Sequence, residues 1–271
     1  MKISYAVQVC DTKSNLNHRR ITDTSKTEIT KRCIHSFVKS LLYVDLFKNI
    51  LTSDNIEQKV LFVMDDCSPE VVTLVENICN STCSPRLSFE VNYLNNGTLR
   101  KSIERTYNYL IDSNSELVYQ VQDDYLFYET SLYEMIDLFF QVRQDCQTDC
   151  VISSYNPPLF WTSGTYRYES TPRVIVPGIK RYWIQTYDVA CTFLTSNAQF
   201  RNHIDLYEKF YDLLPQGDEN RNLESLSLNK MFVERGVLGL LPVNSVAFHL
   251  QSEFEMDVYL DWKSLWEQNK I

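Results

Sequence analysis

Three apolar segments that end on acidic residues are the feature of this sequence that most constrains its fold. Each is a run of β-forming residues followed at once or within one or two residues by carboxylates: Ile3–Val9 before Asp11, Val60–Met64 before Asp65 and Asp66, and Leu117–Val121 before Asp123 and Asp124. Short apolar runs of this kind predict buried strands. The sequence therefore predicts a sheet whose strands deliver carboxylates into the loops that follow them.

Amphipathic helices are predicted between and after these strands. From Thr27 to Leu42, apolar residues recur at steps of three and four, which is typical of a helix with one buried face. Similar patterns predict further helices, the first of them capped by Ser68, over Pro69–Cys79, Thr98–Ile111, Ser131–Arg143, Leu223–Glu234 and Asp257–Gln268. Additional strands are expected over Phe89–Leu94 and Val237–Leu241. This alternation predicts an α/β fold with a mostly parallel central sheet flanked by helices, whose ligands bind at the carboxyl ends of the strands.

Composition and charge limit the number of domains and the class of partner. The 271 residues include only 6 Gly and 8 Pro and contain no repeat or polar linker, so one domain over 1–271 is expected. A formal net charge of −9 gives no strong signal for a nucleic-acid or anionic-membrane partner. The apolar stretch at Met1–Cys10 is too short for a signal peptide or a membrane span, which predicts a cytoplasmic protein.

The adjacent carboxylates Asp123 and Asp124 are the strongest candidates for chemistry. Mg²⁺ and Mn²⁺ prefer oxygen ligands and share them with phosphate groups, so two carboxylates at the end of a strand suit a cation on a diphosphate. The alternative is that the pair caps the following segment or lies in solvent. Its place directly after a predicted central strand favours the cation site.

Two segments resemble the family 2 glycosyltransferases, which have the GT-A fold. Leu61–Glu70 is similar to the second strand of that family with its Asp-Asp-x-Ser loop, and Val121–Met135 is similar to the strand that carries the Asp-x-Asp motif and the helix after it. The similarity keeps its order and spacing from Ile3 to about Phe140. The resemblance implies a nucleotide-sugar-binding half over 1–125, an acceptor half over 126–254 and a C-terminal helix over 255–271.

The same resemblance implies roles for several residues. The nucleotide would be held by residues after the first two strands and at the start of a helix, namely Cys10, Asp11, Asp66 and Arg100 or Lys101. Asp124 would bind the metal, with Asp123 near the ribose or the metal. Gln122 departs from the family pattern, because many relatives have an acidic residue there, and this leaves fewer protein ligands for the cation.

A general base and a histidine complete the expected site. Glu224 stands at the head of a predicted helix that ends at Gly236, where the family places the carboxylate that deprotonates the acceptor; Asp218 and Glu219 are close rivals. His249 follows a short apolar stretch, where relatives present a histidine to the metal or diphosphate. Glu224 as a simple capping residue and His249 as a structural residue are the competing interpretations.

The functional expectation is transfer of a sugar from a nucleotide diphosphate donor, a UDP-sugar, to a hydroxyl acceptor, with inversion and with Mn²⁺ or Mg²⁺ as cofactor. Nucleotidyl transfer is a second enzyme class, but it normally uses a glycine-rich loop near the first strand, and Asp11–Asn15 contains no glycine. A non-catalytic module that binds glycans or proteins is the third reading, for which Gln122 is the hint. The amphipathic tail is expected to pack on the body of the protein or on a second copy.

Overall fold

The computed structural model describes residues 1–12, 24–46, 56–82, 84–94, 97–156, 173–188, 192–214, 223–250 and 260–271. The strands are β1 Lys2–Val9, β2 Glu57–Asp65, β3 Leu87–Leu94, β4 Leu117–Gln122, β5 Tyr125–Phe127, β6 Cys150–Ser153, β7 Ile175–Pro177, β8 Tyr182–Thr186, β9 Phe193–Ser196, β10 Leu238–Pro242 and β11 Ala247–His249. The helices are α1 Lys26–Leu46, α2 Pro69–Ser81, α3 Leu99–Asp112, α4 Ser131–Cys146, α6 Asn197–Asn202, α7 Ile204–Leu213, α8 Leu223–Leu226, α9 Lys230–Val233 and α10 Trp262–Gln268. None of these helices combines the length and the apolar composition that crossing a bilayer requires.

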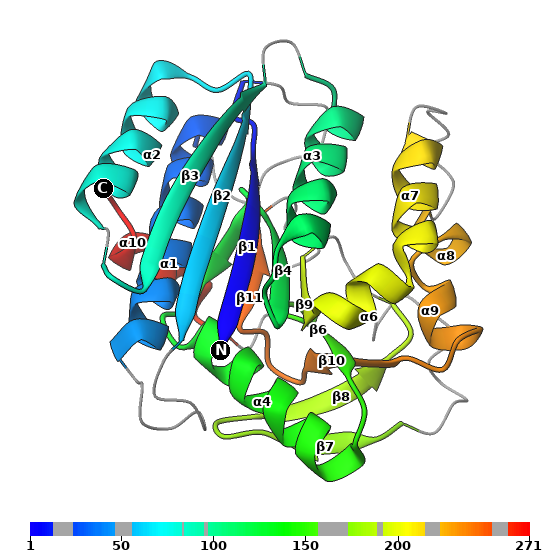
Figure 1. Ribbon diagram of the computed structural model, residues 1–271. Helices are drawn as coiled ribbons and strands as arrows, with labels where there is room; N and C mark the ends of the chain where they lie inside the picture. The colour runs from blue at the N-terminus through cyan, green and yellow to red at the C-terminus, as the bar shows by residue number, and fades with distance from the viewer. Residues whose placement is uncertain are drawn as a thin grey trace.

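A nine-stranded sheet organises the structure, and a small two-stranded sheet of β5 and β11 lies beside it (Figure 1). The strand order is β3-β2-β1-β4-β9-β6-β10-β8-β7. β1 pairs in parallel with β2 and β4, β2 with β3 and β6 with β10, whereas β9 and β8 run against their neighbours. All strands of the large sheet except β9 and β8 therefore share one direction, which confirms the predicted α/β fold with a mostly parallel sheet.

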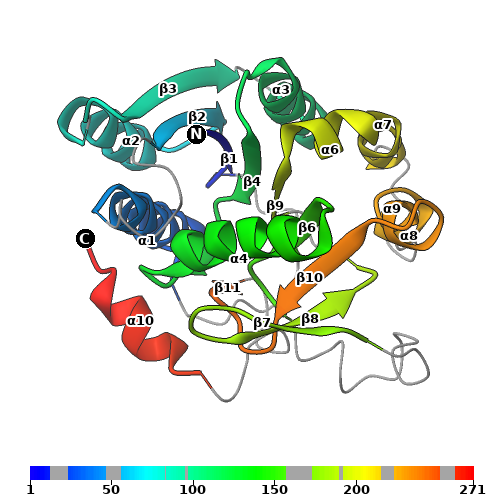
Figure 2. The same ribbon diagram turned by 60° about the horizontal axis from the view of Figure 1, so that its bottom comes forward.

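Helices cover both faces of the sheet. Figure 2 shows α1 and α4 on one side of β1 and β4, and α3 and α6 on the other. Successive side chains of β1 point to opposite faces of the sheet. Tyr5 and Val7 therefore belong to the hydrophobic cluster on the α1 and α4 side, and Ala6 belongs to the cluster on the α3 and α6 side. Both faces of β1 are buried from Ile3 to Val9, and its polar residues Ser4 and Gln8 are buried with them.

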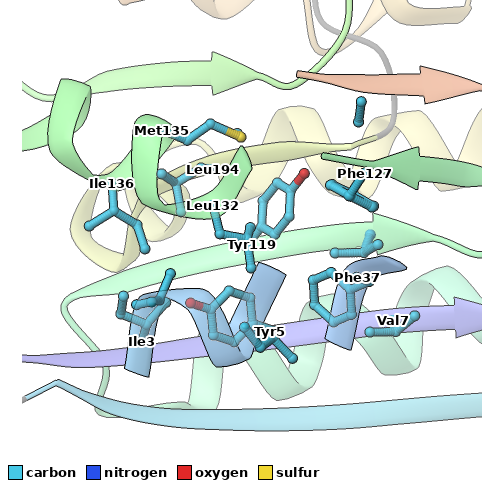
Figure 3. Packing of buried hydrophobic residues seen from close by; sticks show 14 of the residues in the cluster. Ile3, Tyr5, Val7, Phe37, Tyr119, Phe127, Leu132, Met135, Ile136 and Leu194 are labelled. Atoms are coloured by element: carbon cyan, nitrogen blue, oxygen red, sulfur yellow. The ribbon is translucent and has the colours of Figure 1, made fainter. Parts of the chain in front are cut away.

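Aromatic rings join β1 and α1 to β4 and β5 inside the larger cluster (Figure 3). Tyr5 meets Phe37 edge-on at 5.9 Å between ring centroids and Tyr119 at 6.2 Å. Phe127 lies 5.6 Å from Phe37 and 6.4 Å from Tyr119. Edge-to-face pairs of this kind stabilise a core by about 0.5–1.5 kcal/mol each beyond their buried area. The segments before and after Asp124 thus share one core around β1 and β4.

The helix predicted over 223–234 is wrong as a single element. α8 ends at Leu226 and α9 begins at Lys230, with a turn between them. The Ser227 hydroxyl donates to the carbonyl of Leu223 at 2.5 Å, and the Asn229 amide donates to the Asp188 carboxylate at 2.9 Å. Serine and asparagine side chains that bond in this way compete with regular helical hydrogen bonding. The buried apolar residues of this segment, Leu228, Met231 and Phe232, lie in the turn and in α9, whereas α8 has no buried residue.

The C-terminal helix α10 packs on the body of the protein, as the amphipathic pattern predicts. Leu265 and Trp266 are buried in a cluster with Ile29 of α1. The Arg32 guanidinium lies 4.0 Å above the Trp266 ring and donates to the Trp266 carbonyl at 2.9 Å. A buried tryptophan under a cation combines area burial with a cation–π contact. α10 thereby stabilises the position of α1, the helix whose first turn reaches the site described below. Residues 257–259 of the predicted helix lie outside the described ranges.

Replacing Trp266 by alanine is expected to destabilise the protein by about 3 kcal/mol, because a buried tryptophan and its contact with Arg32 are both lost. Urea denaturation monitored by far-ultraviolet circular dichroism measures this change. Gln268→Ala, on the exposed face of the same helix, is the control and should leave the midpoint within the experimental error. Equal midpoints for Trp266→Ala and wild type would show that α10 contributes nothing to the fold.

Candidate active site

The acidic residues gather at one edge of the sheet because neighbouring parallel strands end at the same level. In the register, Val9 of β1 lies beside Met64 of β2, and Gln8 lies beside Gln122 of β4. The residues that follow these positions are the carboxylates Asp11, Asp65, Asp66, Asp123 and Asp124. The carboxyl edge of a parallel sheet is where such folds bind ligands. The candidate site is therefore built from the ends of β1, β2 and β4.

Asp123 has both carboxylate oxygens engaged within the protein. Its Oδ1 accepts from the Lys26 ammonium at 2.8 Å, and its Oδ2 accepts from the Cys10 backbone N–H at 2.9 Å and from the Thr30 hydroxyl at 3.0 Å. Burial raises the pKa of Asp123, and the nearby Lys26 ammonium opposes this rise. Asp123 thus connects β4 to the end of β1 and to the start of α1.

Asp124 has a different environment although it is the next residue. Its Oδ2 lies 3.3 Å from Nε2 of His249 and 3.9 Å from the ammonium of Lys26. Its Oδ1 is buried and has no hydrogen-bond partner among the described residues. Burial favours the neutral carboxyl, but the charges of His249 and Lys26 outweigh it and hold the pKa of Asp124 well below its usual range. Asp124 is therefore a carboxylate with an oxygen left for a ligand.

The pairing of β5 with β11 brings His249 to Asp124. His249 lies opposite Tyr125 in this antiparallel pair. The two rings stack at 4.7 Å between centroids with an interplanar angle of 12°, and Tyr155 meets the imidazole at 6.1 Å and 73°. The backbone N–H of Leu250 donates to the Asp124 carbonyl at 2.8 Å. Strand pairing and two aromatic rings together set the orientation of the imidazole.

Lys26 is a residue of this site that the sequence did not reveal. It begins α1, and burial disfavours its charged form, but the carboxylates of Asp123 and Asp124 outweigh burial and raise the pKa of Lys26. The apolar spacing predicts a helix that begins one residue later, at Thr27, and this spacing carries no information about polar side chains. The polar residues Lys26, Thr27 and Thr30 in its first turn were the available signal, since all of them bond to carboxylates at the strand ends.

The carboxylates that follow β1 and β2 hold loops together. Asp11 accepts from the Ser68 backbone N–H at 2.7 Å and from the Thr27 hydroxyl at 2.7 Å. The Thr12 hydroxyl donates to the carbonyl of Asp66. Asp66 has a φ of 48°, in the left-handed region that asparagine and aspartate tolerate better than most residues. These bonds connect the loops after the two strands to the first turn of α1.

Gly97 and Asp65 are in close contact at the same edge. A Cβ atom at position 97 would overlap the Asp65 carboxylate, so a larger residue there would require that side chain to move. Asp65 is 3% exposed. The sequence does not predict this contact, because a contact between separate loops leaves no local pattern. Glycine allows the chain to approach the carboxylate closely here.

Three further residues that were predicted to bind the nucleotide, Cys10, Arg100 and Lys101, lie in different parts of the structure. Arg100 pairs with Asp212 and lies 5.6 Å from the Tyr211 ring, which connects α3 to α7. Lys101 is exposed, and its backbone N–H donates to the Thr98 cap. Cys10 contributes its backbone N–H to Asp123. The structure therefore brings Cys10 into the carboxylate cluster. The described contacts of Arg100 are with α7.

Glu224 is the second residue of α8, and burial raises the pKa of its carboxyl group. Figures 1 and 2 both show α8 beside α7, to the side of β5 and β11. Within the described part of the chain, no hydrogen bond or ion pair joins its carboxylate to Asp124 or His249. Its rivals Asp218 and Glu219 lie outside the described residues.

The chemistry of Asp124 and His249 fits a divalent cation with few protein ligands. Among the described residues, no group of three or more His, Cys, Asp or Glu side chains is placed to hold a metal ion. The unpartnered buried Oδ1 of Asp124 and the imidazole beside it supply two donors of the right type for Mn²⁺ or Mg²⁺. Such a cation would complete its coordination with phosphate oxygens and water.

Asp123→Ala is expected to lower the free energy of unfolding by about 3 kcal/mol, because it leaves the buried Lys26 ammonium without its partner. Guanidinium denaturation measures the loss. Adding Lys26→Met to this variant should recover part of it, since no unpaired charge then remains. Asp145→Ala on the exposed surface is the control. A loss below 1 kcal/mol for Asp123→Ala would contradict the proposed structural importance of this pair.

Comparisons with known proteins identify similar architectures. The sequence matches no protein-family model and no curated protein. Among solved structures, the chain is similar to residues 1–349 of S. aureus TarS, a GT-A-type glycosyltransferase, with a TM-score of 0.47 and 15% identity over 91% of this chain and 59% of that chain.

Two further likenesses have lower TM-scores. A second S. aureus TarS structure gives a TM-score of 0.43 at 15% identity, over 75% of this chain and 30% of that chain. The 4-diphosphocytidyl-2C-methyl-D-erythritol synthase of Anaerococcus prevotii gives a TM-score of 0.37 at 10% identity, over 98% and 94% of the two chains. The chain spans less than two thirds of the length of either TarS chain. These likenesses concern the fold alone.

Proposed function

We propose that this chain is a cation-dependent glycosyltransferase that moves a sugar from a nucleotide diphosphate donor, a UDP-sugar, to a hydroxyl acceptor in the cytoplasm. The observation that carries the proposal is the carboxylate of Asp124. It lies at the carboxyl edge of the sheet beside His249, and its buried Oδ1 has no partner among the described residues. A buried carboxylate oxygen without a hydrogen bond is costly unless a ligand satisfies it.

The charge state of Asp124 suits a cation ligand. His249 and Lys26 keep its pKa below the usual range, so the carboxylate is ionised at neutral pH. When bound, Mn²⁺ or Mg²⁺ would stabilise the negative charge that develops on the departing nucleoside diphosphate. Asp124 and, once its imidazole has released its proton, His249 would hold it from one side, leaving its other positions for the donor. With Gln122 in place of an acid, two protein ligands imply modest cation affinity.

The nucleotide is proposed to lie along the ends of β1 and β2. Asp11 accepts from the N–H of Ser68, which ends the loop after β2 and caps α2, and Asp66 is half-buried in that loop. A loop held by hydrogen bonds on two sides offers a preorganised surface, which lowers the entropic cost of binding. Cys10, Asp11 and Asp66 are the proposed contacts to base and ribose, with Arg100 or Lys101 reaching the nucleotide from the start of α3.

Glu224 is the proposed general base. It would take the proton of the acceptor hydroxyl as that oxygen attacks the anomeric carbon, while the bond from that carbon to the diphosphate oxygen breaks on the opposite face. This displacement inverts the anomeric centre. Burial raises the pKa of Glu224 toward neutrality, which strengthens it as a base once ionised. Asp218 and Glu219 are the alternative carboxylates.

A thermal-shift screen against nucleoside diphosphates and nucleotide sugars, with Mn²⁺ or with EDTA, tests the donor and the cation together. A ligand at one hundred times its dissociation constant adds about 2.7 kcal/mol to the stability of the folded state. We expect uridine nucleotides to raise the melting temperature most in Mn²⁺, and Asp124→Asn to abolish the Mn²⁺-dependent part. Asp145→Asn, which removes an exposed carboxylate, should behave as wild type. A protein that responds to no nucleotide in either buffer would instead be a binding module.

Glu224→Gln tests the general base separately from the donor site. The variant should bind the donor as wild type does and lose about 10²–10⁴-fold in kcat, the range expected when a positioned proton acceptor is removed. Steady-state kinetics with a surrogate acceptor measure kcat and KM. Asp218→Asn and Glu219→Gln are the matched comparisons. If one of these two loses kcat and Glu224→Gln does not, the base is assigned to that residue instead.

A further inference from the structure

We infer that Lys26 binds the diphosphate of the donor directly, as a cation supplied by the protein beside the metal site. The identity of the ligand rests on the proposed function, whereas the placement of the ammonium rests on the structure alone. Lys26 belongs to neither segment that resembles the glycosyltransferase family, and it lies about one hundred residues before the carboxylates that it contacts.

The ammonium has hydrogen-bonding capacity left for a ligand. A lysine offers three N–H donors. One is directed to Oδ1 of Asp123 at 2.8 Å, whereas Oδ2 of Asp124, at 3.9 Å, is beyond hydrogen-bond distance. No other hydrogen bond from this ammonium is found among the described residues. The Lys26 side chain keeps 17% of its surface exposed, so the group is held firmly but is not sealed inside the protein.

Asp123 acts as the positioning residue for this ammonium. Its second oxygen is anchored by the Cys10 N–H and the Thr30 hydroxyl, which leaves Oδ1 to bind Lys26 alone. The buried carboxylate therefore holds the ammonium next to Asp124, on the side of the proposed cation site. A side chain held in this way loses little additional conformational entropy when a phosphate binds.

The start of α1 adds to the positive potential at this point. α1 is 21 residues long and begins at Lys26, so the positive end of its dipole accompanies the lysine side chain. Helix starts with an adjacent cation are suited to phosphate oxygens. The side chain and the helix start therefore favour the same ligand.

Lys26 also accounts for how a site with two metal ligands could hold a diphosphate. Gln122 stands where an acid would add a ligand, and the described residues offer the cation only Asp124 and His249. A permanent positive charge on Lys26 would compensate part of the charge of the diphosphate independently of the metal. Diphosphate binding should then persist, weakened, when the divalent cation is removed.

Isothermal titration with UDP and with inorganic pyrophosphate, each in Mn²⁺ and in EDTA, tests this inference. Pyrophosphate isolates the phosphate contacts from those to the base. Wild type should bind both ligands in EDTA, and Lys26→Met should weaken this cation-independent binding at least tenfold. Lys26→Arg should retain most of it. Lys31→Met is the matched control, because Lys31 lies on the same helix and pairs with Glu28.

A double variant guards against loss of folding. Lys26→Met leaves Asp123 without its partner, so Lys26→Met/Asp123→Asn, which is neutral at both positions, should keep the native circular dichroism spectrum and the same weakened binding in EDTA. The inference would be overturned if wild type and both Lys26→Met variants bound the ligands equally well in EDTA. It would also be overturned if wild type bound UDP in Mn²⁺ but not in EDTA. Absence of UDP binding by wild type in both buffers would instead overturn the proposed function.

Discussion

The ion pair between Asp123 and Lys26 is the interaction on which the site depends. Its carboxylate joins the loop after β4 to the end of β1 and to α1, through one ammonium, one backbone N–H and one hydroxyl. Taking both charges out of water is costly, and the additional hydrogen bonds offset that cost. The neighbouring Asp124 can remain ionised with an unsatisfied oxygen because the same ammonium and His249 are close. One residue of the acidic pair thus serves the fold, and the next is left for chemistry.

Contacts between distant parts of the chain position the other half of the site. Arg181 forms an ion pair with the buried Glu134 of α4 at 2.6 Å and donates to the carbonyls of Asn244 and Ser245 at 2.7 and 2.9 Å. The backbone N–H of Tyr128 donates to the carbonyl of Val246, the next residue along. These bonds hold the segment that leads into β11. The imidazole of His249 therefore depends on α4 and on the loop between β7 and β8.

The sequence predicts the local elements well because strands and helices leave periodic patterns. The ends of β1, β2 and β4 and the gathering of carboxylates at one edge follow from those patterns and from the geometry of parallel sheets. Lys26 and the contact of Gly97 with Asp65 do not, because they depend on which loops meet in space. The sequence also does not predict the break between α8 and α9. The apolar spacing continues across Ser227 and Asn229, whereas the side chains of these two residues form hydrogen bonds to Leu223 and Asp188.

The central pairing of β1 with β4 has a consequence for how the protein folds. Ile3 lies beside Leu117, a separation of 114 residues. Folding slows as the sequence separation of native contacts grows, because chain entropy must be lost before such contacts form. At typical rates of synthesis, β4 would leave the ribosome on the order of 10 s after β1. During that interval the apolar strand β1 has β2 as its only sheet neighbour, which makes the nascent chain a candidate client for chaperones until β4 arrives.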